Sequence, residues 1–109
     1  MKNALIIFGG VSSEHNVSCV SATSVIRNIP KDKYNVIMLG ISTKGEMFVY
    51  EGDFNNLKND GWLHDKSMLK KAVISTDRAD HGIVVFNENG YKKVKVDVCF
   101  PVMHGKNGE

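Results

Sequence analysis

The chain has 109 residues, a formal net charge of +2, 42% hydrophobic and 24% charged residues. This length fits one domain without room for a second, and the composition is that of a globular protein with a buried core. Because the net charge is small and lysines alternate with acids, neither nucleic acid nor a membrane surface is expected as a partner. The lysines at 70–71 and within 92–95 are interpreted as solvated faces.

The first apolar run, residues 4–8, is too short to cross a bilayer and is followed by no cleavage site. We therefore expect a cytoplasmic protein without a secretory signal. Cys19 and Cys99 lie in apolar sequence without a partner motif. The favoured interpretation is two buried free thiols in a reducing compartment, and a disulfide between them is the alternative.

A strand, a helix and a second strand are predicted in the first part of the chain. Residues 4–8 are continuously apolar and end at two glycines, which is typical of a strand buried on both faces. Residues 34–41 form a second apolar run. Between them, apolar residues recur at helical spacing, with Ser13 or Ser18 as candidate caps and Pro30 as the stop. The positions in this helical stripe are Cys19, Ala22, Val25, Ile26 and Ile29.

The middle of the chain is less regular and predicts a β-rich insertion at the edge of a parallel sheet. Short strands are expected at 46–50 and 73–75, and the polar segment 52–65 has Trp62 as its anchor. Residues 82–86 and 91–94 flank an Asn-Gly pair, which is a strong hairpin signal. The predicted fold is therefore α/β: a small, open, mainly parallel sheet flanked by helices, with a β-hairpin insertion.

The last predicted strand covers residues 96–103 and leads into a glycine-rich loop at 104–109. Such a loop after a core strand normally leads into a helix, so we expect the chain to be a truncated piece of a larger enzyme. Ligands of open parallel sheets bind at the carboxyl ends of the strands. The loops at 9–15 and 104–109 both leave such ends, so Glu14 and His104 would face one cleft if the first and last strands are near neighbours.

Common nucleotide motifs are absent from these loops. Neither G-x-G-x-x-G nor G-x-x-x-x-G-K-[ST] occurs in the sequence. His15 and His104 have no partner at an expected metal-ligand spacing, so no metal bound by this chain is predicted. Taken alone, Glu14 is explained as an acidic residue in the first turn of a helix, and His104 as a histidine in a loop. A functional role for either residue is inferred only because the two loops occur together.

The two loops together resemble the D-alanine–D-alanine ligase family. Residues 8–18 read FGGVSSEHNVS and match the family's F-G-G-x-S-x-E-x-x-V-S, while residues 100–109 read FPVMHGKNGE and match F-P-x-x-H-G-x-x-G-E. The resemblance implies that residues 1–109 form the N-terminal, Rossmann-like domain that precedes the ATP-grasp domains of such an enzyme. It is weaker between residues 55 and 89.

The family joins two D-amino acids: ATP phosphorylates the carboxylate of the first D-alanine, and the amine of the second attacks the acyl phosphate. By resemblance, Glu14 would bind the ammonium group of the first D-alanine and Ser18 would support that glutamate. His104 would position the same substrate, Gly105 would allow close backbone approach, and Glu109 would brace the site. Glu14 is the residue for which a catalytic role is expected.

The resemblance also implies what this chain lacks. ATP and Mg²⁺ would be bound by domains that are not present, so the chain alone is predicted to be inactive. Family members are commonly homodimers, and a homodimer is expected of the full-length enzyme.

Three alternatives stay open at this stage. The segment around residues 50–53 and 61–62 is similar to the vancomycin-resistance branch that makes D-alanyl–D-serine, although D-alanyl–D-alanine synthesis is the default. Another ATP-grasp ligase, such as a biotin carboxylase-like protein, would share the architecture but not the two loops. A non-catalytic flavodoxin-like module would need an acidic cluster or a phosphate-binding loop at the first strand end.

Overall fold

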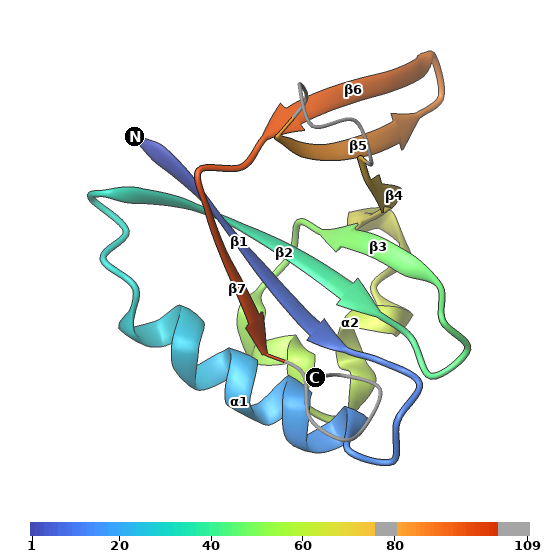
Figure 1. Cartoon of the computed structure of the whole chain (residues 1–109). Helices are drawn as coiled ribbons and strands as arrows, with labels where there is room; N and C mark the ends of the chain where they lie inside the picture. The colour runs from blue at the N-terminus through green and yellow to red at the C-terminus, as the bar shows by residue number, and fades with distance from the viewer. Residues whose placement is uncertain (76–80, 103–109) are drawn as a thin grey trace.

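In a computed structural model, residues 1–75 and 81–102 are described, and their strands form one seven-stranded sheet in the order β6-β5-β4-β3-β2-β1-β7 (Figure 1). The strands are β1 (Lys2–Gly9), β2 (Tyr34–Ile41), β3 (Met47–Tyr50), β4 (Leu69–Ile74), β5 (Gly82–Asn87), β6 (Gly90–Lys95) and β7 (Val98–Val102). The helical elements are α1 (His15–Asn28), η1 (Phe54–Asp60), α2 (Gly61–His64) and η2 (Lys66–Met68).

The parallel part of the sheet has β1 at its centre, with β2 on one side and β7 on the other. Phe8 is in register with Gly40 of β2 and with Val102 of β7. The first and last strands are therefore neighbours, which is the condition under which Glu14 and His104 were expected to face one cleft. Pro101 fits in β7 because this strand lies at the edge of the sheet, where a missing backbone N–H is tolerated.

The remaining strands run antiparallel to their neighbours from β2 through β6. The α/β class and the hairpin are confirmed, and Asn87 pairs with Gly90 at the hairpin turn. The sheet is mixed rather than mainly parallel. The predicted insertion supplies four antiparallel strands, β3 to β6, and these continue the same sheet from β2. The brief strand expected at 73–75 is the end of the longer β4, which also contains the exposed lysines 70 and 71.

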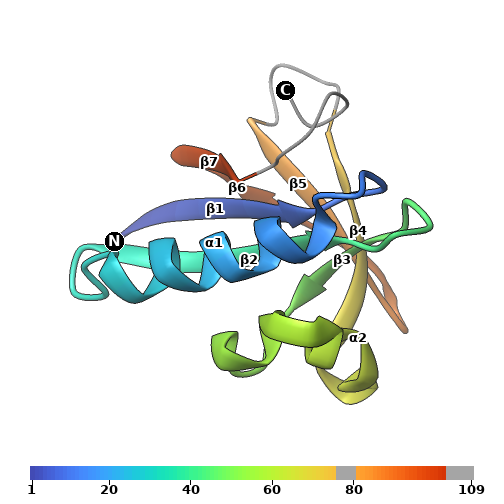
Figure 2. The ribbon, with the colours of Figure 1, turned by 90° about the horizontal axis from the view of Figure 1, so that it is seen from below.

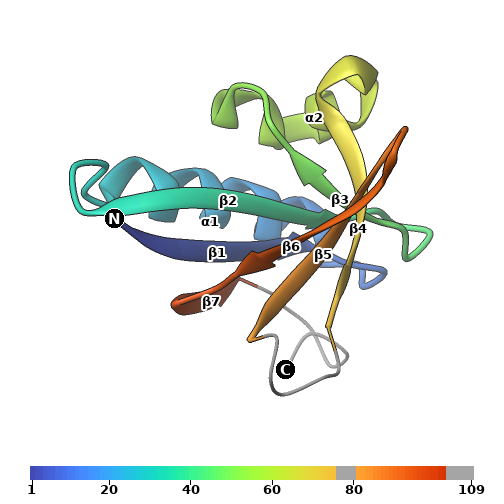
Figure 3. The same ribbon diagram turned by 90° about the horizontal axis from the view of Figure 1, so that it is seen from above.

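The helices cover one face of the sheet. Figures 2 and 3 show α1 and α2 on the same side of β1 and β2, with β5 and β6 curling toward the other side. Alternate residues of each strand point to opposite faces, so the core is divided into two clusters. The helix-side cluster contains Ile6, Phe8, Cys19, Ala22, Ile26, Met38, Tyr50, Leu57 and Trp62. The opposite cluster contains Leu5, Leu39, Val49, Ala72 and Ile83.

Helix α1 begins one residue after Glu14, which is the N-cap. Neither Ser13 nor Ser18 caps it: the N-cap makes no side-chain capping hydrogen bond, and Ser18 lies inside the helix with its hydroxyl bonded elsewhere. The helix ends at Asn28, and the C-cap Ile29 has an extended backbone, as expected of a residue that precedes proline.

The polar segment after β3 folds back over the helix-covered face. Trp62 is fully buried there, and its ring meets Phe8 edge to face at a centroid distance of 4.9 Å. Its predicted role as anchor is confirmed, with the buried Leu57 as a second anchor. Asn59 and Asp60 both have left-handed backbone conformations, with φ of 56° at each. These two residues turn the chain from η1 into α2 and bring Asp60 toward α1.

Both cysteines are free thiols, but only one is buried. Cys19 lies in the helix-side cluster, whereas Cys99 is exposed on the edge strand β7. The expectation of two buried thiols is therefore wrong for Cys99, because the edge strand leaves the consecutive residues Cys99, Phe100 and Pro101 open to solvent. Across residues 1–75 and 81–102, no helix has the length and apolarity needed to cross a membrane.

The contact between β2 and the Trp62 ring depends on the absence of a side chain at Gly40. A Cβ there would lie 2.4 Å from the Trp62 ring and 2.6 Å from the Phe8 ring. We predict that Gly40→Ala lowers the free energy of unfolding by about 1–3 kcal/mol through overpacking, measured by urea denaturation. Lys33→Ala, at an exposed position just before the same strand, should change it by less than about 0.5 kcal/mol. Equal effects of the two substitutions would contradict this packing.

Candidate functional site

The candidate site lies where β1 and β7 end side by side. The two strands are parallel neighbours, so β1 and β7 end at the same edge of the sheet (Figure 1). The first turns of α1 lie beside this edge, because only a short loop separates β1 from His15. The end of β1, the end of β7 and the first turns of α1 thus meet at one edge of the sheet.

The turn out of β1 requires glycine. Gly9 and Gly10 have φ of +87° and +109°, a region that residues with a side chain rarely adopt. A Cβ on Gly9 would also lie 2.2 Å from the Ile41 carbonyl oxygen. The Gly10 amide donates a hydrogen bond of 2.8 Å to that oxygen, which fixes the loop against the end of β2.

Ser18 joins the ends of β1 and β7. Its hydroxyl oxygen accepts a 2.9 Å hydrogen bond from the Gly9 amide, and its hydroxyl hydrogen is donated to the Val102 carbonyl. The side chain is fully buried. One hydroxyl on α1 therefore satisfies a backbone donor of one strand end and a backbone acceptor of the other.

Glu14 lies at the start of α1, half-buried beside this junction. Its backbone amide donates to the Ser12 hydroxyl at 2.9 Å, which orients the residue. Among the residues that the structure describes, no hydrogen bond or ion pair engages its carboxylate.

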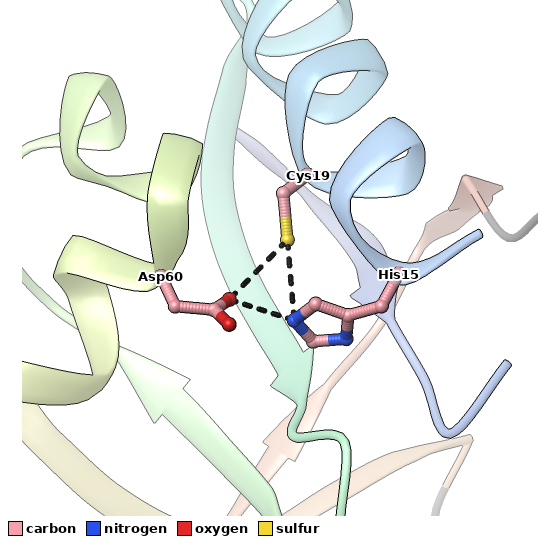
Figure 4. A group of neighbouring side chains, drawn as sticks. All are labelled: His15, Cys19 and Asp60. Atoms are coloured by element: carbon pink, nitrogen blue, oxygen red, sulfur yellow. Dashed lines mark hydrogen bonds and ion pairs between the residues drawn. The ribbon is translucent and has the colours of Figure 1, made fainter. Parts of the chain in front are cut away.

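A second polar group, made of His15, Cys19 and Asp60, links α1 to the segment before α2 (Figure 4). The buried His15 ring donates from Nδ1 to the Gly10 carbonyl at 2.8 Å, and its Nε2 lies 2.7 Å from Asp60 Oδ1. Trp62 Nε1 donates to the same carboxylate oxygen at 3.3 Å. The Cys19 sulfur lies 3.7 Å from His15 Nε2 and 3.9 Å from Asp60 Oδ1.

This environment suppresses ionisation of the Cys19 thiol. Burial, and then the nearby Asp60 charge, raise the pKa of Cys19 from 9.0 to about 12. The thiol therefore stays protonated at neutral pH, and its S–H is available as a weak donor to the carboxylate. Burial also raises the pKa of Cys99, but that residue is exposed to solvent.

Two of the five residues that the sequence singled out are described, and the structure brings them to one junction. Glu14 and Ser18 lie on the first turns of α1, four residues apart, beside the ends of β1 and β7. His104, Gly105 and Glu109 lie outside the described residues, so their expected roles stay predictions.

The contacts of His15 with Asp60 and Cys19 were not predicted, because no partner for His15 was recognised at an expected metal-ligand spacing. The spacing of four between His15 and Cys19 was a usable signal, because such residues share one face of a helix. Asp60 gave no comparable signal, since its place depends on the left-handed backbone at residues 59 and 60.

The fold and site together define an α/β domain that presents a glycine turn and a carboxylate at the carboxyl ends of parallel strands. Small ligands bind at this position in many α/β proteins. The sequence model of the family described as "D-ala D-ala ligase N-terminus" matches residues 3–109. The chain therefore belongs to the D-alanine–D-alanine ligase family and corresponds to its N-terminal part.

Individual relatives show the same relationship. The D-alanine–D-alanine ligase of Thermoanaerobacter sp. (strain X514) is 42% identical over 110 residues, covering 99% of this chain and 29% of the relative. The vancomycin C-type resistance protein VanC1 of Enterococcus gallinarum is 38% identical over 109 residues, covering 100% of this chain and 29% of the relative. The crystal structure of the VanG D-Ala:D-Ser ligase from Enterococcus faecalis superposes with a TM-score of 0.91 at 40% identity, covering 99% of this chain and 30% of that one. The chain thus spans less than a third of these relatives.

The Ser18 bridge predicts a measurable loss when its hydroxyl is removed. Ser18→Ala leaves the buried Gly9 amide without its acceptor, so we expect the free energy of unfolding to fall by about 1–3 kcal/mol. Ser24→Ala, at an exposed position of the same helix, is the matched control and should be nearly neutral. Urea denaturation of both variants measures the difference. A Ser18→Ala chain as stable as Ser24→Ala would refute the bridge.

The two thiols should differ sharply in reactivity. In the folded chain, an aromatic disulfide reagent such as DTNB should titrate Cys99 quickly and leave Cys19 unmodified, because Cys19 is buried and protonated. Cys99→Ser should abolish the fast reaction, and unfolding in urea should expose both thiols in the unmodified sequence. Fast reaction of the folded Cys99→Ser chain would show that Cys19 is accessible.

Proposed function

We propose that this chain forms one wall of the first-substrate site in an ATP-dependent D-alanine–D-alanine ligase. In the proposed reaction, the carboxylate of one D-alanine receives the terminal phosphoryl group of ATP. The amine of a second D-alanine then attacks the acyl phosphate, releasing inorganic phosphate and the dipeptide. The observation that carries the proposal is the Glu14 carboxylate, unengaged among the described residues, at the joined ends of β1 and β7.

The role proposed for Glu14 follows from its surroundings. A half-buried carboxylate is partly desolvated, so a charge-assisted hydrogen bond from an ammonium group is stronger there than in open water. Binding the ammonium group of the first D-alanine would direct the substrate's carboxylate away from α1. Orientation of this kind lowers the barrier because the reacting groups already face each other.

Ser18 has an indirect part in this proposal. Its hydroxyl holds the turn at Gly9 against the carbonyl of Val102, two residues before His104. The end of β7 is thereby joined to the first turns of α1, where Glu14 lies. The proposal therefore assigns His104, Gly105 and Glu109 to the same D-alanine, with His104 as a positioning residue.

The described residues do not fit the Mg²⁺ ion that the family implies. Mg²⁺ is bound by oxygen ligands, usually carboxylates together with phosphate oxygens and water. In the part of the chain that the structure describes, the one cluster with metal-ligand geometry contains a nitrogen and a sulfur, from His15 and Cys19. We therefore propose that ATP and Mg²⁺ are bound outside the described residues, and we expect the chain alone to be inactive.

A second candidate is D-alanyl–D-serine synthesis, which the similarity to the VanG ligase favours. Identity of 40% to that enzyme and 42% to a D-alanine–D-alanine ligase does not separate the two. The acceptor that the intact enzyme uses can be measured by supplying D-alanine with ATP, with and without D-serine, and identifying the dipeptides. Preferential formation of D-alanyl–D-serine would select the second candidate.

Two further properties belong to this proposal. Synthesis of a peptidoglycan precursor from free amino acids and ATP takes place in the cytoplasm, so we assign the enzyme to that compartment. We also expect the intact enzyme to be a homodimer, as is common in the family.

Glu14→Gln in the intact enzyme tests the proposed contact. The amide keeps the size of the side chain but removes the charge, so kcat/KM for D-alanine should fall by about 10- to 150-fold, which corresponds to roughly 1.5–3 kcal/mol. Phosphate release with ATP and D-alanine measures the rate.

Glu88→Gln is the matched control, because Glu88 is exposed at the β5–β6 turn, at the opposite end of the sheet order from β7. It should leave kcat/KM unchanged. Unaltered kinetics in Glu14→Gln would mean that Glu14 only stabilises the N-terminus of α1. The proposed substrate site would then have no basis.

A further inference from the structure

Three side chains that can bind a metal converge between α1 and the start of α2 (Figure 4). His15 and Cys19 lie one turn apart on α1, and Asp60 approaches from the residue before α2. Their ligand atoms lie within 4.8 Å of one another. His15 and Cys19 are buried, whereas the Asp60 side chain is 28% exposed, so an ion would enter past Asp60.

The hydrogen bonding of His15 calls for a positive charge at this place. A carbonyl oxygen only accepts, so the 2.8 Å contact with Gly10 requires a proton on Nδ1. In the neutral ring, Nε2 then carries a lone pair, yet it lies 2.7 Å from a carboxylate oxygen. Two acceptors at this distance repel each other unless a cation lies between them. That cation is either a proton, carried by the ring or by the Asp60 carboxyl group, or a metal ion.

The surroundings of His15 match those of a metal-bound histidine. Such histidines usually donate the other ring N–H to a backbone carbonyl or a carboxylate, which fixes the ring orientation. Here Nδ1 makes that bond to Gly10, so Nε2 is directed at the cluster. Asp60 is held in place by Trp62 Nε1 and by its left-handed backbone conformation.

The distances fit a small tetrahedral ion. Bond lengths of about 2.0–2.3 Å from zinc to nitrogen, oxygen and sulfur place neighbouring ligand atoms about 3.3–3.6 Å apart. The observed separations from Cys19 Sγ are 3.7 Å to His15 Nε2 and 3.9 Å to Asp60 Oδ1. These two need to shorten by a few tenths of an ångström. The 2.7 Å pair of His15 and Asp60 opens by about 0.6 Å when an ion replaces the proton between them.

We propose that His15 Nε2, Cys19 Sγ and Asp60 Oδ1 form a Zn²⁺ site, with a fourth position for water or another ligand. Thiolate, imidazole and carboxylate together suit zinc, whereas an oxygen-only set would suit magnesium. On binding, the Cys19 thiol releases its proton to solvent, and so does Nε2 where it carries one. The ion would tie α1 to the η1–α2 segment one residue away from Glu14.

Titration with Co²⁺ alone tests the site, because cobalt takes zinc sites and is coloured. Adding Co²⁺ to the 109-residue chain should produce a saturable thiolate-to-cobalt charge-transfer band with the visible absorption of a tetrahedral ion, at one ion per chain. One equivalent of Zn²⁺ should displace the colour. Absence of a saturable band would overturn the proposal and leave a proton shared by His15 and Asp60 between the two atoms.

Matched variants separate this site from adventitious binding. Cys99→Ser removes the exposed thiol outside the cluster and should leave the band unchanged. Cys19→Ser should abolish it, and Asp60→Asn should weaken Co²⁺ affinity at least about 10-fold. Circular dichroism shows whether each variant is folded; if Cys19→Ser is not, Asp60→Asn and Cys99→Ser decide. A band that survives Cys19→Ser, or that disappears with Cys99→Ser, would overturn the proposal.

Discussion

The hydroxyl of Ser18 accepts the amide hydrogen of Gly9 and donates its own hydrogen to the carbonyl of Val102. These two backbone groups end neighbouring parallel strands, and a buried group without a partner would cost about 1–3 kcal/mol. The hydroxyl therefore ties both strand ends to the first turns of α1. The position of Glu14 at this edge depends on that tie, because its loop is bounded by Gly9 and α1.

Behind this junction lies a second constraint that comes from the middle of the chain. Asp60 contacts His15, and His15 holds the Gly10 carbonyl, so the η1–α2 segment is connected to the same turn. Trp62 anchors that segment through its ring contact with Phe8. Phe8 is also the residue of β1 that is paired with Gly40 of β2 and Val102 of β7. The apolar core and the polar junction are thus adjoining parts of one structure, and a change in either is expected to move Glu14.

Regular features of the sequence predicted much of this arrangement. The apolar run of β1, the spacing along α1 and the Asn-Gly turn each reflect local chemistry, and all three elements are present. The neighbouring position of β1 and β7 was only a condition of the predicted cleft, because glycine-rich loops at strand ends do not fix the order of strands in a sheet. The contacts of Asp60 could not be predicted, because two consecutive left-handed residues reverse the chain without a glycine. The exposure of Cys99 likewise depends on β7 being an edge strand, which is a property of the whole sheet.

The central claim is that one small zwitterion touches both the loop after β1 and the loop after β7. A crystal structure of the intact enzyme with D-alanine and a non-hydrolysable ATP analogue tests it most directly. Our account predicts the ammonium group within hydrogen-bonding distance of a Glu14 carboxylate oxygen, with His104 against the same molecule. A D-alanine bound away from Glu14, or His104 directed into a different cavity, would contradict it.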